Sequence, residues 1–195
     1  MLERNIVTGE ETNRYFLHHN GLAKEWEKFA EEKNGKIKGA VNGQILEFNL
    51  NFAINETRIH IYQIRQLSNK HSGAILDDGI LMTKYTRIEI RPFFLTKSEN
   101  WKIVKNNGWL QYWYNIIGFT VPLNYNTDYL LVSYKKLGSQ DTLSKIQFDL
   151  LTKTAELKRI VRKNSFLKIE FNNVLGTDSV RKILTLILQP EKKRS

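Results

Sequence analysis

Cysteine is absent from the 195 residues, and no run of apolar residues approaches the length of a membrane span. Without thiols the chain cannot form disulfides, cysteine-ligated zinc or iron–sulfur sites, or a thiol nucleophile. A transmembrane helix needs about 20 mostly apolar residues, so the sequence predicts none. With three Pro and eleven Gly, the composition also argues against a collagen-like or largely disordered chain.

Recognisable catalytic motifs are missing as well. The sequence contains no GxSxG nucleophile motif, no glycine-rich phosphate loop and no HExxH zinc motif. Asp77-Asp78 precedes Gly79, which is typical of a turn, and His60 falls within a predicted strand. We therefore expect no catalytic residue, metal or cofactor; an enzyme that uses His60 or the Asp77-Asp78 pair in a pocket stays as an alternative.

Positive charge is what the chain has in excess. The net charge is +10, and the pI is about 9.7. Residues 151–195 hold 11 Lys and Arg against 4 Asp and Glu, whereas residues 1–150 hold 19 against 16. Such a basic C-terminal side can attract nucleic acid, anionic lipid or an acidic partner. The simpler interpretation is a lysine-rich solvated surface.

The first half of the chain predicts a helix followed by strands. Apolar residues at helical spacing indicate a helix over about 10–33, with Trp26 in the core, a break near Gly21 and a left-handed stop at Asn34-Gly35. Period-two alternation then predicts strands over 45–52, 57–66 and about 79–94. Turns are expected at Asn42-Gly43, Asn55-Glu56 and 77–79. This pattern favours an antiparallel meander with one solvent-exposed face.

The second half predicts a strand over 129–134 and then helix, strand and helix. Asp141 is expected to cap a helix that carries Leu143, Ile146 and Leu150, and a further helix is expected over 156–163. Alternation predicts a strand over 166–171, and Asp178 is expected to cap the last helix. Residues 99–120 fit a helix and a strand almost equally well, so both remain open. The prediction is a single α+β domain over 1–195, with an ordered core of about 10–190 and a basic tail at 191–195.

Two features could serve binding. In a helix over 156–163, Lys158, Arg159, Arg162 and Lys163 would form a basic stripe, to which Arg181 and Lys182 of the last helix add charge. The second feature is the aromatic segment Trp101–Phe119. Helical spacing places Trp113 in the core, whereas Trp109 directly follows Asn106-Asn107-Gly108, which favours partial exposure. The candidate binding residues are therefore Trp109, Arg159, Arg162, Lys163, Arg181 and Lys182.

Several segments together resemble a known family. They are LAKEWEKFAEEKNGKIKG, the G-x-x-x-G segment at 39–43, TRIEIRP, NTDYLLVSY and LLTKTAELKRIVRK. This order resembles bacterial domains of unknown function that begin with a W-x-x-x-A helix and a G-x-x-x-G hairpin. The resemblance implies an α+β module. It transfers no catalytic residue, and the membrane helices that often accompany that domain have no counterpart in this sequence.

The first hypothesis is therefore a non-enzymatic binding or scaffolding domain. One form of this hypothesis is a domain that binds at the membrane surface. The alternative is non-specific nucleic-acid binding by the basic C-terminal surface. Residues 1–9 contain no apolar stretch of signal-peptide length, so we expect a cytoplasmic location.

Overall fold

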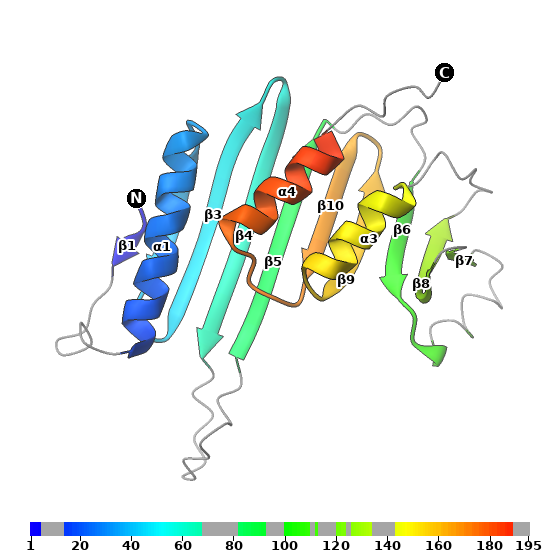
Figure 1. Ribbon diagram of the computed structural model, residues 1–195, viewed down its shortest axis with the longest axis horizontal. Helices are drawn as coiled ribbons and strands as arrows, with labels where there is room; N and C mark the ends of the chain where they lie inside the picture. Colours follow the sequence, from blue (N-terminus) through cyan, green and yellow to red (C-terminus); the bar gives the residue numbers. More distant parts are fainter. Residues whose placement is uncertain are drawn as a thin grey trace, which may run out of the picture. The chain divides into compact units, whose positions relative to one another are not determined.

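A computed structural model describes residues 1–4, 14–67, 82–92, 100–109, 112, 120–123, 126–133 and 143–188. The chain has a mixed α+β fold, as predicted, and divides into two compact units (Figure 1). The first unit comprises Met1–Ile88 with Asn172–Leu175, and the second comprises Glu89–Phe171 with Gly176–Ser195. The prediction of one domain over 1–195 stays a prediction.

The first unit is a sheet with one helix on one face. Its elements are β1 (Glu3–Arg4), α1 (Arg14–Glu32), β2 (Lys36–Val41), β3 (Ile45–Ile54), β4 (Thr57–Leu67) and β5 (Met82–Arg91), which reaches the second unit at Glu89. The strand order is β1-β2-β3-β4-β5. The pairs β2–β3 and β3–β4 are antiparallel, which confirms that part of the predicted meander. A simple meander is nevertheless wrong, because β1 adds a parallel strand at the edge of β2.

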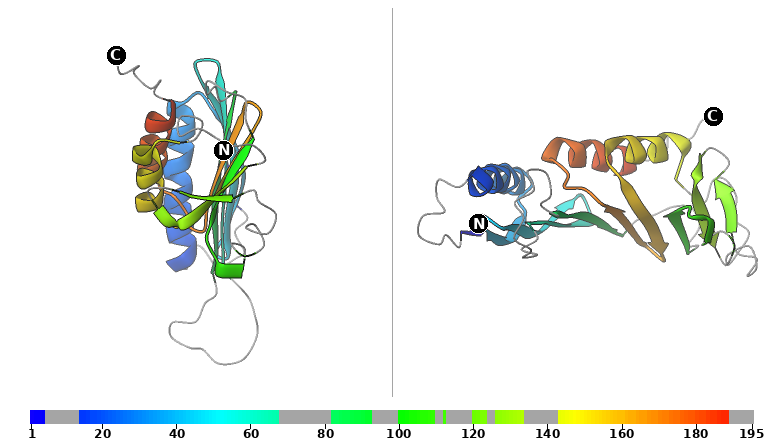
Figure 2. Two further views of the ribbon diagram at one scale, coloured as in Figure 1. Left: turned by 90° about the vertical axis from the view of Figure 1, so that its right-hand side faces the viewer. Right: turned by 90° about the horizontal axis from the view of Figure 1, so that it is seen from below.

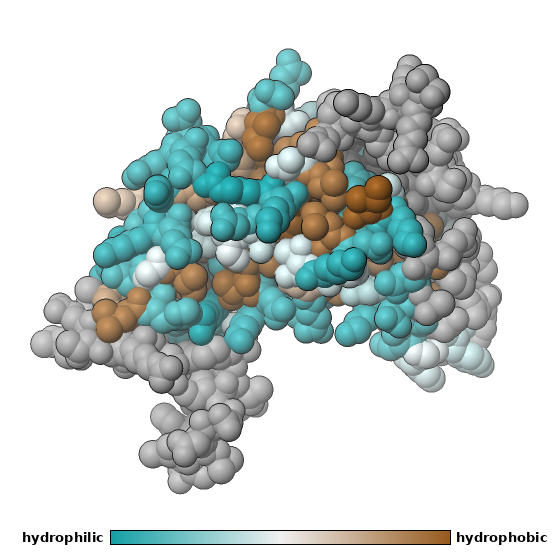
Figure 3. All heavy atoms as spheres, viewed as in Figure 1, coloured by the Kyte–Doolittle hydropathy of each residue, from teal (hydrophilic) through white to brown (hydrophobic). Residues whose placement is uncertain are grey.

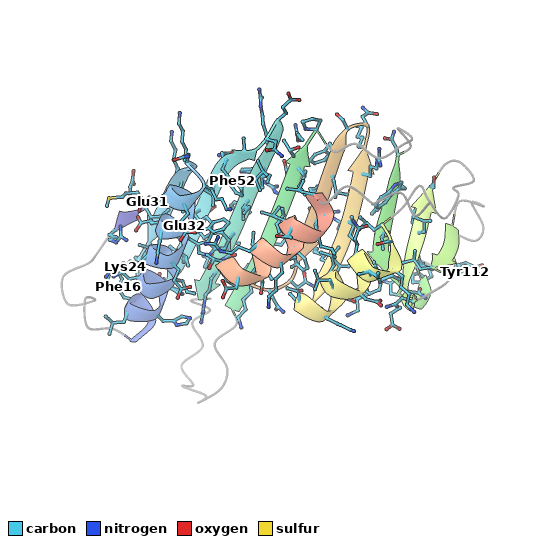
Figure 4. The ribbon with its side chains drawn as sticks, turned by 45° about the horizontal axis from the view of Figure 1, so that its top comes forward. Phe16, Lys24, Glu31, Glu32, Phe52 and Tyr112 are labelled. Atoms are coloured by element: carbon cyan, nitrogen blue, oxygen red, sulfur yellow. The ribbon has the colours of Figure 1, made fainter. Side chains whose placement is uncertain are left out.

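Helix α1 forms as its apolar stripe predicts, and it is continuous through Gly21, so the expected break there is wrong. The helix ends where Asn34 adopts a left-handed conformation (φ 49°) and the Gly35 amide donates to the Ala30 carbonyl over 2.7 Å. Side chains on its outer surface include Lys24, Glu31 and Glu32 (Figure 4).

Aromatic rings fill the space between α1 and the strands. The Trp26 ring is fully buried, as predicted, with its centroid 4.9 Å from that of Phe48. The Phe29 ring meets Phe52 edge-on at 5.7 Å. Gly39 in β2 has a φ of +155°, and a Cβ there would lie 2.0 Å from the Glu47 carbonyl oxygen. Glycine is therefore required for β2 to approach β3 at this point.

A buried polar network attaches Asn172–Leu175 to the strands of the first unit. The Leu175 amide donates to Gln63 Oε1 over 3.3 Å and lies 3.2 Å from Thr86 Oγ1. The Thr86 hydroxyl donates to the Asn173 carbonyl over 2.7 Å. Because buried polar groups are costly when unpaired, these bonds fix the position of the segment.

The second unit has strands in a different order. Its elements are β6 (Trp101–Lys105), β7 (Thr120–Leu123), β8 (Asn126–Ser133), α3 (Lys145–Thr154), β9 (Leu157–Lys163), β10 (Phe166–Phe171) and α4 (Thr177–Leu188). The strand order is β10-β9-β6-β8-β7, so β6 lies between β9 and β8 rather than beside a sequence neighbour. Figure 2 shows α3 and α4 on the same face of these strands.

In the C-terminal quarter the predicted strand over 166–171 and the last helix are confirmed, but the helix over 156–163 is wrong. The order is α3-β9-β10-α4, because Glu156–Lys163 is not a helix: Leu157–Lys163 forms strand β9. The register between β9 and β10 shifts between Glu170 and Phe171, and such a bulge interrupts strict alternation. Leu157 and Ile160 are therefore both buried at a spacing of three, which is also typical of a helix.

The starts of both helices differ slightly from the prediction. Ser144, not Asp141, caps α3: its side chain accepts from the Gln147 amide, and the Gln147 side chain accepts from the Ser144 amide. Asp178 lies in the first turn of α4, where its charge favours the helix N-terminus. Asp141 itself lies outside the described residues, as do His71, Asp77-Asp78, Trp113 and the tail at 191–195.

Exposed apolar side chains occur on the helices. Hydrophobic side chains are visible over α3 and α4 (Figure 3), and Ile146 of α3 is 65% exposed. Within the described parts of the chain, no helix is long and apolar enough to cross a membrane.

Candidate functional site

The candidate site is the face of the first unit's strands that points away from α1. Alternation directs Leu46, Phe48 and Leu50 of β3 toward the helix, and all three are buried. The intervening side chains and their cross-strand partners therefore point the opposite way, and no helix in the described part of the first unit lies on that side (Figure 2). We call this surface the open face; it carries Lys36, Lys38, Glu47, Asn49, Asn51, Arg58, His60, Tyr62, Tyr85, Arg87, Glu89 and Arg91.

Two tyrosines and an arginine form the centre of the open face. The ring centroids of Tyr62 and Tyr85 lie 6.0 Å apart, with the planes at 57°. The Arg87 guanidinium carbon lies 5.2 Å from the Tyr62 ring centroid, within the range of a cation–π contact. All three side chains are half-buried, so their edges reach solvent.

Hydrogen bonds across β3 and β4 hold the polar side chains in place. Tyr62 donates its hydroxyl proton to Glu47 Oε1 over 2.9 Å, and His60 Nε2 donates to Asn49 Oδ1 over 3.0 Å. Both are diagonal contacts, since Tyr62 pairs with Asn49 and His60 with Asn51 in the backbone register. The four side chains therefore form an ordered polar row beside the tyrosine pair.

The electrostatics favour binding over proton transfer. Burial, together with the hydrogen bond and charge of Glu47, raises the pKa of Tyr62 to about 12. The phenol therefore stays neutral near pH 7 and acts as a hydrogen-bond donor rather than as a base, whose pKa would lie near the working pH. The described residues also hold no group of three His, Cys, Asp or Glu that could bind a metal ion.

Cations outnumber carboxylates on the open face. On β2 to β5 the open face carries Lys36, Lys38, Arg58, Arg87 and Arg91 against the carboxylates of Glu47 and Glu89. Lys36, Lys38 and Arg58 are exposed. The surface is therefore positively charged and polar, with aromatic rings at its centre.

The residues proposed from the sequence lie elsewhere, in the second unit. Because β9 is a strand, Arg159 and Arg162 do not share a helical stripe: they point to opposite faces, and Arg162 is only 3% exposed. Lys163 is exposed at the end of β9, whereas Arg181 and Lys182 belong to α4. The structure does not bring these residues together as one basic stripe.

Arg159 has a partner within the second unit. Its Nη2 lies 3.0 Å from Glu170 Oε1, and its Nε also contacts the Glu170 carboxylate. Lys168 Nζ lies 3.1 Å from the same Oε1. Burial raises the pKa of Glu170, but the hydrogen bonds from Arg159 and Lys168 outweigh it and hold that pKa below its ordinary value. Arg159 therefore compensates a buried charge.

Trp109 is exposed, as its position after Asn106-Asn107-Gly108 suggested. The side chain is 68% exposed, and its ring stacks on that of Tyr112 with 6.5 Å between centroids. Tyr112 points outward from the second unit (Figure 4) and is 60% exposed.

Sequence reasoning missed the open face, although the signal for it is present. The alternation over 45–52 and 57–66 predicts a solvent-exposed face, but alternation within one strand does not indicate which side chains meet across the pair. The tight turn at Asn55-Glu56 fixes the register, and that register places Glu47 and Asn49 diagonally opposite Tyr62 and His60.

Comparison of the chain with protein-family models, curated proteins and solved structures finds no match. The resemblance to a bacterial domain family therefore stays a prediction.

Proposed function

We propose that this protein is a non-enzymatic binding protein that holds a single strand of nucleic acid on the open face. The observation that carries the proposal is the half-buried Tyr62–Tyr85–Arg87 group at the centre of a positively charged sheet surface. Proteins that bind single strands combine a basic surface for phosphates with planar side chains on which unpaired bases stack.

The flanking cations fit the phosphate part of such a ligand. Lys36 and Lys38 are exposed on β2, and Arg58 is exposed on β4, so the three lie on both sides of β3. Long, exposed basic side chains can follow a flexible backbone without a fixed geometry. A duplex fits less well, because its base faces are stacked on one another and cannot reach the rings.

A lipid surface is a weaker fit for the open face. Peripheral membrane binding combines cations with apolar side chains that enter the bilayer. The most exposed large apolar side chains of the described residues are Met1, Leu17, Trp109, Tyr112 and Ile146, and none belongs to the open face. The open face therefore offers none of these exposed apolar side chains to anchor the protein in a membrane.

The proposed binding surface is the open face and not the basic C-terminal residues that the sequence suggested. Arg159 compensates the buried Glu170 carboxylate, and Arg162 is itself buried. Replacing either by Glu would place a carboxylate against a buried charge or inside the core, and the variant would lose stability whatever it binds. Those substitutions cannot test binding.

Fluorescence anisotropy with a labelled oligothymidylate tests the proposal. The variant Lys36→Glu/Lys38→Glu/Arg58→Glu is compared with Lys145→Glu/Lys153→Glu/Lys182→Glu, which makes the same charge change at exposed positions on α3 and α4. We expect the open-face variant to lose binding by at least about tenfold and the control to bind within about twofold of the parent. Three phosphate contacts predict a loss of about twentyfold in parent affinity when salt rises fourfold.

Equal weakening in the two variants would overturn the proposal, since it would indicate a non-local charge effect. The proposal is also contradicted if the parent binds vesicles of anionic lipid but no oligonucleotide.

A further inference from the structure

Glu47 is the carboxylate that the open face carries beside the tyrosine–arginine group, whereas Glu89 of β5, on the same face, forms an ion pair with Arg91. The charge of Glu47 repels the phosphates that nearby cations such as Lys38, which pairs with Asn49, would attract. One oxygen, Oε1, accepts the Tyr62 hydroxyl proton over 2.9 Å. Among the described residues no hydrogen bond is made to the other oxygen, Oε2.

The side-chain amide of Asn49 lies next to the Glu47 carboxylate and complements it as a hydrogen-bond donor. Glu47 and Asn49 are two residues apart on β3, so their side chains project from the same face about 7 Å apart at the backbone. Asn49 uses Oδ1 to accept from His60, which leaves the Nδ2 amide as a donor directed by that bond. The strand therefore offers a carboxylate acceptor and an amide donor side by side.

Only one nucleobase edge matches this pair of groups. The Watson–Crick edge of guanine carries two adjacent donors, N1–H and the N2 amino group, beside the O6 acceptor. A carboxylate can accept from both donors while an amide donates to O6. Adenine and cytosine each offer one donor next to an acceptor, and thymine offers one donor between two acceptors. A carboxylate would therefore pair with them less completely.

We propose that the open face selects guanine: the base stacks against the tyrosine–arginine group, and Glu47 accepts from its N1–H and N2 amino groups while Asn49 donates to O6. This inference rests on the proposed function, because it requires that a single strand lies on this surface. It gives the Glu47 carboxylate a role on a surface that otherwise attracts phosphates.

The test uses oligothymidylates of one length in which the central base is thymine, guanine, hypoxanthine, adenine or cytosine. Competition against a labelled parent strand measures the relative affinities. We expect guanine to bind about tenfold more tightly than thymine, because a good bidentate base contact discriminates by at least that factor. Hypoxanthine lacks the N2 amino group and should fall between the two.

The variant Glu47→Gln isolates the carboxylate. It should reduce the guanine preference to within about twofold, while binding of the all-thymine strand is unchanged or tighter because a negative charge is removed. Glu56→Gln, at an exposed position of the β3–β4 turn, makes the same charge change and should keep the preference.

Two outcomes would overturn the inference: binding of all five strands with equal affinity, or an unchanged guanine preference in Glu47→Gln. Both leave the proposed function intact, since the strands still bind. Absence of binding by every strand would overturn the proposed function, and this inference with it.

Discussion

Arg87 holds its guanidinium over the ring of Tyr62, with the guanidinium carbon 5.2 Å from the ring centroid. The contact joins β5 to β4 on the side away from α1, and the hydrogen bond from Tyr62 to Glu47 extends it to β3. A ring held by a cation and a hydrogen bond loses little further freedom when a base stacks beside it. Preorganisation of this kind favours binding.

The first prediction concerns the ionisation of Tyr62. A phenol absorbance titration should show one tyrosine that ionises at about pH 12 and disappears in Tyr62→Phe, because burial and Glu47 raise its pKa. The folded-state pKa lies above the unfolded value of about 10, so this group's contribution to stability is complete below pH 10 and is lost as pH rises toward 12.

The variant Glu47→Gln should lower the pKa of Tyr62, since the negative charge is removed, but not to the ordinary value, since burial remains. An unshifted pKa of Tyr62 in Glu47→Gln would show that the hydrogen bond between the two side chains does not form.

The second prediction concerns the buried network at Thr86. Thr86→Val removes the donor to the Asn173 carbonyl and the acceptor near the Leu175 amide, so both backbone groups lose a partner. We expect a loss of about 1–3 kcal/mol in the free energy of unfolding, measured in urea. Thr83→Val, at an exposed position of the same strand, should stay within about 0.5 kcal/mol of the parent. Equal stabilities of the two variants would contradict the network.

The third prediction concerns pH and His19. His19 is fully buried, and its Nδ1 donates to the Asn42 carbonyl over 3.0 Å. Its Nε2 has no hydrogen-bond partner among the residues that the structure describes. Burial lowers its pKa, and the nearby charge of Arg65 adds to this effect. The pKa of His18 is also lowered, by burial and by Arg65.

Because the unfolded chain binds protons more readily than the folded one, the free energy of unfolding should fall as pH drops below about 6.5. Urea unfolding at pH 7.5 and 5.5 measures the difference, and His19→Gln should reduce it. A parent protein that is equally stable at both pH values would show that His19 is protonated as easily when folded as when unfolded.

The fourth prediction compares two tryptophans. Trp26→Ala should cost about 3–5 kcal/mol, since the ring is fully buried against Phe29 and Phe48. Trp109→Ala should change the free energy of unfolding by at most about 0.5 kcal/mol, since the ring is 68% exposed. Thermal or urea unfolding distinguishes the two. A large loss in Trp109→Ala would place this ring in the core.

Long regular patterns made much of the first unit predictable. The apolar stripe of α1 extends over several turns, and the alternation in β3 and β4 is strict, so local sequence determines both the element and its buried face. The position of β6 between β9 and β8 could not be predicted in this way, because it depends on pairing between distant residues. Local patterns carry no information about such pairing.

Two local signals were interpreted wrongly for physical reasons. The spacing of Leu157 and Ile160 is helical in appearance, but it arises from a bulged strand. Asp141 is a residue type that caps helices, but α3 is capped by Ser144, which forms with Gln147 a capping-box pattern that is visible in the sequence. The candidate site was missed because each polar residue is ordinary by itself. Only the register of β3 and β4 joins Glu47 to Tyr62 and Asn49 to His60.

The most direct test of the account is a map of the binding surface. Backbone amide chemical shifts are recorded by NMR while an unlabelled oligothymidylate is added to the isotope-labelled protein. We predict that the largest changes fall on residues 47–51, 60–64 and 85–87, which surround the open face. Changes confined to the second unit, at Arg159–Lys168 or around Trp109, would contradict the assignment of binding to the open face.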